Sequence, residues 1–498
     1  MLRAYRLSPT VIFSAISFLI CGQLLCGTSP LFVALMAVCM LCIGVTYNLL
    51  GGLSTFSGIL FAVFSLDSIV VSQFAKVFLF QAADTSIDVP LLTITAYALC
   101  YVCILTGVFI YGQLRITDLP KPLETTSGEQ SSVVYFGALG VGVIANFFFQ
   151  SRLTLGNTGE QEFGAERSFG LIFSALLLFA LVLAVDARIR NTNGAHSFDW
   201  KAFVPWLLTA FFGFVDSSRS AMMTSTVAYF ATCYLRGYRF KRRHFVTAVI
   251  GGVLFSVYIS PFAIYERYSL YGLQFQSRVY EAFHLLLTVP NRATIALATE
   301  NATQINSGRA EYYGGAPGTY ILNRLSVIRE DSLIFAACAN GYHYGWTSIK
   351  TDILINVPRF LYKNKPDTDS AAFVGRVTGM NPDAETNNEN VFSPIGDAFG
   401  GFGFLGVAAF GFCVLPLMFV ILESIFDMGK PWGTVAIGML LPLFGEGSAG
   451  SYIVNIYRIP IYLILLSLVV GGIARMFPTR GDRPWLPQFE PAGESSDE

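Results

Sequence analysis

Long apolar runs, separated by short polar ones, form the dominant pattern of this chain. A helix needs about 17–25 apolar residues to cross a bilayer, and twelve runs approach this length. They cover residues 8–27, 30–50, 53–72, 90–112, 132–150, 167–186, 202–215, 220–235, 245–264, 399–425, 432–449 and 454–474. The pattern predicts an all-α, polytopic integral membrane protein with about 12 transmembrane helices.

Fifteen Lys and Arg residues at the chain ends and in the short connections fall on one side of a path with twelve crossings. They are Arg3, Arg6, Arg115, Lys121, Arg188, Arg190, Lys201, Arg236, Arg239, Lys241, Arg242, Arg243, Arg475, Arg480 and Arg483. Short cytoplasmic loops are enriched in Lys and Arg, so this side is predicted to be the cytoplasm, and to hold both termini. The predicted division is transmembrane helices 1–9 over residues 1–264, a large external loop over 265–398, helices 10–12 over 399–476 and a cytoplasmic tail over 477–498.

The composition supports a membrane protein and excludes several function classes. The chain is 53% hydrophobic and 13% charged, whereas a soluble domain carries about 25% charged residues. Its net charge of −1 gives no basis for nucleic-acid binding. It has neither a P-loop nor a Rossmann glycine fingerprint, and no clustered metal-ligand set. We therefore expect no metal, no cofactor and no nucleic-acid partner.

The predicted external loop contains apolar residues at helical spacing. They occur in Val279–Pro290, Thr319–Ala337 and Ile349–Arg359, which predicts short amphipathic helices lying against the outer membrane face. A polar segment then leads into the glycine-rich run Phe399–Gly406. Its glycines allow close helix packing or a bend, and close packing is the preferred interpretation.

Cationic side chains near the outer ends of the apolar runs are candidates for binding an anion. A guanidinium group binds phosphate through two parallel hydrogen bonds and keeps its charge. Arg219, in the interruption between two apolar runs, is the clearest case. An arginine at membrane depth is costly, and such residues usually have a function. The alternatives for Arg219 are a pair with Asp216 on one helix face, or a side chain that extends to the membrane interface. The candidate cations are Arg219, Arg278, Arg324, Arg329, Arg359, Lys363, Lys365 and Arg458.

Two carboxylates and one histidine complete the candidate chemistry. Asp397 lies where the polar segment enters the tenth apolar run, and Glu389 precedes it by eight residues. Either is a candidate general base. His343, in Gly341–Gly345, has a tyrosine on each side. It is a candidate for a hydrogen bond to a sugar, and a packed turn histidine is the alternative.

These features together resemble a known family. The matching pieces are Ser218-Arg219-Ser220 opening an apolar run that ends in a basic cluster, the stretch Asn356–Lys365, and Ser393–Asp397 leading into Phe402–Gly406. With the predicted topology, they resemble the bacterial O-antigen and oligosaccharide repeat-unit polymerases, the Wzy-type membrane glycosyltransferases. The resemblance implies a GT-C-like, metal-independent enzyme in the bacterial cytoplasmic (inner) membrane.

The resemblance also implies a reaction and partners. The expected substrate is a polyprenyl-pyrophosphate-linked oligosaccharide, which is transferred onto another lipid-linked repeat unit at the outer face of the membrane. Arg359 is then expected to act in catalysis with Asp397 or Glu389, and the other cations and His343 to bind substrate. A chain-length regulator and a flippase are expected partners beside the lipid bilayer. An O-antigen ligase-like enzyme, a lipid-linked-oligosaccharide flippase or other secondary transporter, and a non-catalytic scaffold are the alternatives.

Overall fold

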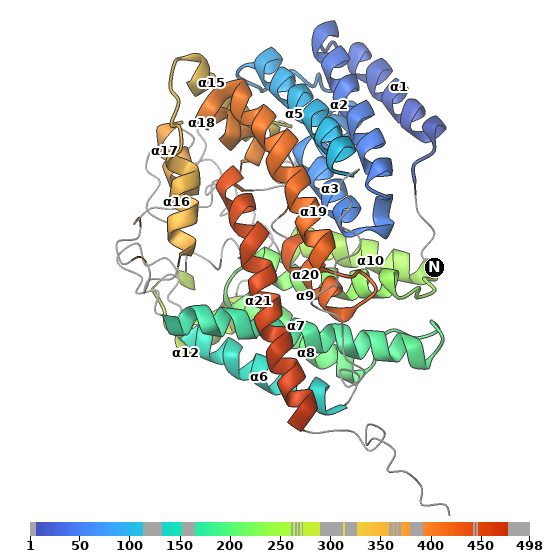
Figure 1. The fold of residues 1–498 in the computed structure, drawn as a ribbon, viewed down its shortest axis with the longest axis vertical. Helices are drawn as coiled ribbons and strands as arrows, with labels where there is room; N and C mark the ends of the chain where they lie inside the picture. Colours follow the sequence, from blue (N-terminus) through green and yellow to red (C-terminus); the bar gives the residue numbers. More distant parts are fainter. Residues whose placement is uncertain are drawn as a thin grey trace, which may run out of the picture.

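The computed structural model describes most of the chain as helices. The described residues are 6–112, 132–151, 165–259, 262–263, 266, 269–270, 272–288, 312–313, 326–357, 362, 366, 370–378, 392–441, 444 and 447–476. Within them every regular element is a helix (Figure 1). Seven helices there are long and apolar enough to cross a membrane. The prediction of an all-α chain with membrane-spanning helices is confirmed at this level, and the count of twelve crossings stays a prediction.

Each of the twelve predicted apolar segments overlaps a helix or a run of consecutive helices. They are α1 (Pro9–Leu25), α2 (Pro30–Leu49), α3 (Phe56–Ser65) with η2 (Leu66–Val70) and α4 (Val71–Phe78), α5 (Pro90–Tyr111), α6 (Ser132–Ser151), α7 (Ala165–Asn191), α8 (Trp200–Val215), α9 (Arg219–Leu235), α10 (Arg242–Leu254) with η5 (Phe255–Ile259), α18 (Pro394–Ala409) with η6 (Phe410–Val414) and α19 (Leu415–Ile425), α20 (Pro431–Leu440) and α21 (Ala449–Met476). A short 3-10 turn, η1 (Gly52–Ser54), precedes α3.

Local sequence explains where many of these helices begin. Ser8, Thr55, Asp199, Ser218 and Ser393 each accept a backbone N–H of the following first turn. Such caps satisfy donors that have no partner inside the helix. Proline opens α1, α2, α5, α18 and α20, where its missing N–H costs nothing. Apolar length therefore predicts where a helix forms, and a capping residue or a proline marks the start of many of these helices.

The helices pack in two groups that α21 connects. One group holds α1 to α5 with α18 and α19, and the other holds α6 to α9 with α20. In Figure 1 the red α21 runs diagonally in front of both, and it contacts α18 and α19 as well as α6 and α7. The helix α10 is an exception, because its main packing partner is η5, its own continuation, and none of its residues is buried.

Four further helices lie along the left side of Figure 1. They are α12 (Phe275–Thr288), α15 (Ile328–Ala339), α16 (Thr347–Asn356) and α17 (Ser370–Val377). The first three overlap the three amphipathic stretches that the sequence predicts, where those stretches fall in the described residues. α12 packs on α6 and α8, α15 on α5 and α18, and α16 on α21. The described part of the predicted external loop thus contains helices that pack onto the bundle.

Contacts between helix ends form two sets. One set joins Asn48 to Leu7, Glu423 to Ser57, and Tyr135 to the carbonyl of Lys201. The other set joins the end of α6 to the α8–α9 turn, and the starts of α18 and α21 to each other. Each contact connects ends that a path of twelve alternating crossings puts on the same side. The predicted cytoplasmic ends meet in the first set and the predicted external ends in the second.

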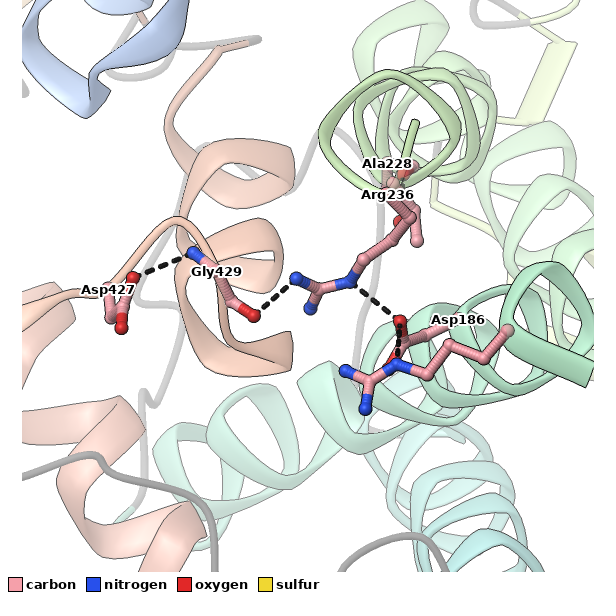
Figure 2. Close-up of polar contacts among 7 residues, drawn as sticks. Asp186, Ala228, Arg236, Asp427 and Gly429 are labelled. Carbon is pink, nitrogen blue, oxygen red and sulfur yellow. Dashed lines mark hydrogen bonds and ion pairs between the residues drawn. The ribbon is translucent and has the colours of Figure 1, made fainter. Parts of the chain in front are cut away.

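A buried ion pair belongs to the first set (Figure 2). Arg236, at the end of α9, lies with its Nε 2.7 Å from Oδ1 of Asp186 on α7. Its Nη1 donates to the carbonyl of Gly429, in the connection between α19 and α20. Arg190 donates to the same Asp186 oxygen over 3.0 Å. Arg236 thereby connects the ends of α7 and α9 to the α19–α20 connection.

Candidate functional site

A cavity of about 310 Å³ lies among α6, α7, α8, α9, α20 and α21. It occupies the half of this group that holds the end of α6 and the α8–α9 turn. Apolar side chains such as Phe149 and Leu177 form most of its wall. The polar residues in the wall are Asn146, Gln150, Ser174, Thr209, Asp216, Thr224, Arg458 and Tyr462. An apolar pocket with a few polar groups at one end suits an amphiphilic ligand.

Arg278 stands behind the polar end of this cavity. It belongs to α12 and none of its surface is exposed. Its Nη1 donates to Oδ1 of Asp216 over 2.9 Å, and its Nη2 donates to the carbonyl and to Oε1 of Gln150 over 2.9 and 3.2 Å. Burial lowers the pKa of Arg278 and Asp216 opposes the shift. The cation therefore binds α12 to the ends of α6 and α8, and its field reaches the cavity wall.

Arg458 is the cation in the cavity wall itself. It lies on α21 and is half-buried. Its Nη1 donates to Oδ1 of Asn356 over 2.7 Å. Asn356 is the last residue of α16, so this bond connects the cavity wall to the stretch Asn356–Lys365 singled out in the sequence. A charged side chain inside an apolar helix is costly, and such residues usually line a polar path or a ligand site.

Arg219 lies close to the same place. It is the first residue of α9, half-buried, and Ala221 and Thr224 on the following turns line the cavity. The sequence suggested Asp216 as its alternative partner, and in the structure Asp216 forms an ion pair with Arg278. Three of the predicted cations, Arg219, Arg278 and Arg458, are thus brought around one cavity from three separate parts of the chain.

Asp397 lies elsewhere, inside a set of buried carboxylates. Its exposed fraction is 2%. Its Oδ1 accepts the Tyr344 hydroxyl over 2.9 Å, and its Oδ2 accepts the backbone N–H of Ala449 over 2.8 Å. It therefore joins the start of α18 to the start of α21, where free N–H groups favour a carboxylate. Asp397 does not line the cavity, and its role as a base stays a prediction.

Asp331 and Asp352 brace the same region. Asp331, on α15, accepts the Tyr97 hydroxyl over 2.6 Å and the N–H of Ser393 over 2.8 Å. Burial raises its pKa from 3.8 to about 7. Asp352, on α16, accepts the hydroxyl of Ser448 just ahead of α21. Each carboxylate satisfies donors at a helix start, so these groups anchor α15 and α16 to the bundle.

The glycine-rich run serves both purposes that the sequence left open. A Cβ placed on Gly400 would lie 2.2 Å from the Tyr344 hydroxyl oxygen, so glycine permits this close approach. Gly403 has φ 61° and ψ −145°, a conformation open essentially to glycine alone, and it breaks α18. The run therefore packs closely at one position and bends the helix at another.

The other predicted residues divide into two classes. His343 is exposed, and its Cε1 lies 3.9 Å from a Cβ placed on Gly403. Arg329 is half-buried on α15, and its carbonyl accepts the Ser332 hydroxyl. Neither lines the cavity. The remaining predicted residues, Arg324, Arg359, Lys363, Lys365 and Glu389, lie outside the described residues.

Sequence reasoning missed several groups at these sites. Gln150 holds Arg278 and lines the cavity, and its polar side chain at the end of an apolar run was the available signal. Glu266 is fully buried beside the side chain of Ser217. Burial raises its pKa to about 8. Nothing in the local sequence distinguishes Glu266 from an exposed glutamate.

Comparison of the chain with models of protein families, with characterised proteins and with solved structures finds no match. The arrangement of residues around the cavity is therefore the basis for assigning a function. That arrangement combines an apolar wall, one lining arginine and two further arginines nearby. Its chemistry suits a ligand with an anionic head and an apolar tail.

Proposed function

We propose that the protein is a membrane glycosyltransferase of the oligosaccharide repeat-unit polymerase type. It transfers a polyprenyl-pyrophosphate-linked oligosaccharide onto another lipid-linked repeat unit at the outer face of the bacterial cytoplasmic membrane. The observation that carries this proposal is the cavity of about 310 Å³ with Arg458 in a mostly apolar wall. A pyrophosphate fits the cation, and the first isoprene units fit the wall.

The residues supply what this transfer needs without a metal. The acceptor hydroxyl oxygen attacks the anomeric carbon, and the bond from that carbon to the pyrophosphate oxygen breaks. Negative charge grows on the departing pyrophosphate, where Arg458 and Arg219 stabilise it. Arg278 neutralises Asp216, which lies in the cavity wall, so that this carboxylate does not oppose the binding of the pyrophosphate.

The proton of the acceptor hydroxyl passes to a carboxylate. We favour Glu389 for this step over Asp397, because Asp397 is 2% exposed and both of its oxygens already accept hydrogen bonds. Replacing Glu389 with Gln is expected to stop polymerisation while the protein stays in the membrane. The same result from Asp397→Asn, with Glu389→Gln active, would reverse the assignment.

The test of the function is the length of the glycan chains in a strain that lacks the gene. We expect single repeat units on the lipid carrier, and long chains again when the wild-type gene is returned. Arg458→Ala is expected to give single units only, and Arg458→Lys, which keeps the charge, an intermediate length. Arg376→Ala is the matched control, since Arg376 is an exposed cation on α17, and it is expected to restore full length.

Two results of this experiment would contradict the proposal. Normal glycan chain lengths in the Arg458→Ala strain, with wild-type amounts of protein, would show that the cavity is not the site of the transfer. Long chains that remain unattached to their final acceptor in the deletion strain would indicate a ligase in place of a polymerase.

A flippase is the second candidate, and one observation favours it. Helix α18 is broken at Phe402 and Gly403, and transporters often place such broken helices beside a cavity between helices. The two candidates differ in the side on which substrate accumulates. Loss of a flippase leaves single lipid-linked units at the inner face, whereas loss of a polymerase leaves them at the outer face.

A further inference from the structure

Four cations within five residues lie at the start of the apolar helix α10, which makes few contacts with the other described helices. Arg239, Lys241, Arg242 and Arg243 are all exposed. None of them forms an ion pair with any residue that the structure describes. The sequence has no Asp or Glu between Asp216 and Glu266. This part of the chain therefore carries positive charge with no counter-charge of its own.

The helix that follows presents an equally unmatched apolar surface. No residue of α10 is buried. Phe245 is 73% exposed, and Val246, Val249 and Ile250 are 50–54% exposed. A Cβ placed on Gly251 or Gly252 would meet nothing within 4 Å. A helix of 13 residues is about 20 Å long, close to the depth of one bilayer leaflet with its headgroups.

The cations are held in place by the backbone beneath them. The N–H of Arg239 donates to the carbonyl of Gly194 over 3.2 Å. The N–H of Lys241 donates to Nδ1 of His244 over 3.0 Å. Phe240 stacks on Phe230 of α9 with ring centroids 6.3 Å apart. These contacts fix the segment at the end of α9, while its charged side chains stay exposed.

We infer that this segment and α10 form a binding site for anionic glycerophospholipids of the surrounding membrane. The phosphate heads would lie among Arg239, Lys241, Arg242 and Arg243, and the acyl chains along Phe245 and the residues that follow. Exposed aromatic rings at the boundary, Phe240 and Phe245, have the position that such rings take at a membrane interface. A nucleic acid or an acidic protein matches the charges but leaves the apolar helix uncovered.

The proposed lipid site lies at α10, which makes few contacts with the other described helices. Elsewhere each long apolar helix packs on several others, and α10 depends on η5. Juxtamembrane Lys and Arg gain about 1 kcal/mol each from anionic lipid. Lipid bound here would therefore hold α10 against the end of α9, where Arg236 already ties the bundle to Gly429.

The test uses the full chain in vesicles of equimolar phosphatidylglycerol and phosphatidylcholine. The protein is then released into mild detergent, and native mass spectrometry counts the lipids that stay bound. We expect wild-type protein to retain phosphatidylglycerol in large excess. Arg242→Gln/Arg243→Gln removes two charges and is expected to lower the ratio roughly 10- to 30-fold. Arg242→Lys/Arg243→Lys is expected to keep most of the preference.

A matched control removes two charges elsewhere. Lys350 and Arg376 are exposed on α16 and α17, so Lys350→Gln/Arg376→Gln is expected to keep the wild-type ratio. Equal retention of the two lipids by wild type would overturn the inference, and so would a wild-type ratio in Arg242→Gln/Arg243→Gln. A stable dimer that cross-links through α10 would overturn it too, since a second copy would then cover this surface.

Discussion

The guanidinium of Arg278 lies 2.9 Å from the carboxylate of Asp216, and the arginine has no exposed surface. This pair connects α12 to the wall of the cavity. Removing one member leaves the other buried without its counter-charge, which costs about 3–5 kcal/mol. We expect Asp216→Ala to lower the melting temperature in detergent strongly. Arg190→Gln, which removes a half-exposed partner of Asp186, is the control and is expected to cost less than about 1 kcal/mol.

The Arg278 pair also allows a test of its contribution to activity. Asp216→Asn keeps the shape of the side chain and one acceptor oxygen, so part of the fold stability should remain. If Arg278 assists the reaction by neutralising Asp216 in the cavity wall, this variant retains activity, while Arg278→Gln leaves the carboxylate charged and loses activity. Equal loss in both, at equal amounts of folded protein, would assign the pair a structural role.

Tyr344→Phe is predicted to destabilise the junction of α18 and α21. The Tyr344 hydroxyl donates to Oδ1 of Asp397, and its removal leaves that buried oxygen with one donor fewer. An unsatisfied buried group costs about 1–3 kcal/mol. The free energy of unfolding, or the melting temperature at fixed detergent, measures this. Tyr342→Phe is the control, since Tyr342 is exposed, and no change is expected from it.

Gly403→Ala is predicted to strain or straighten the break in α18. At φ 61° and ψ −145° an alanine costs on the order of 1–3 kcal/mol. Gly251→Ala is the opposite case, because Gly251 lies within α10 with open space around it. Alanine there is expected to be neutral or to stabilise by up to about 1 kcal/mol. A similar melting temperature for both variants would show that the break is not fixed by Gly403.

The stability of the protein is predicted to fall as the pH rises through the range in which Asp331 titrates. Burial raises its pKa from 3.8 to about 7, so between these values the folded state holds a proton that the unfolded chain has released. The contribution of this proton to the free energy of unfolding is then fully present below about pH 4 and is lost as the pH rises toward 7. Asp331→Asn has no such proton, and the decline between pH 5 and pH 8 should be smaller in it. An unchanged decline would contradict the prediction.

The sequence predicted the helices well because a membrane imposes one dominant rule. Apolar length marks each crossing, and capping residues such as Ser218 and Ser393 mark the starts. The interaction of Arg278 with Asp216 could not be predicted from the sequence, because the two residues lie 62 positions apart and no local pattern indicates that they pair. For the same reason the sequence did not predict the hydrogen bonds of Asp397 with Tyr344 and Ala449. The role of Asp397 as a base stays a prediction.

The break in α18 has a consequence for how the protein is made. Gly400 lies just before the break, and its carbonyl accepts the N–H of Tyr344 over 3.1 Å. A free carbonyl in lipid costs several kcal/mol, so this donor supplies what the broken helix lacks. Tyr344 precedes Gly400 in the chain and leaves the ribosome first. In the predicted topology, the tenth apolar segment therefore meets a donor from an earlier segment on the same side of the membrane.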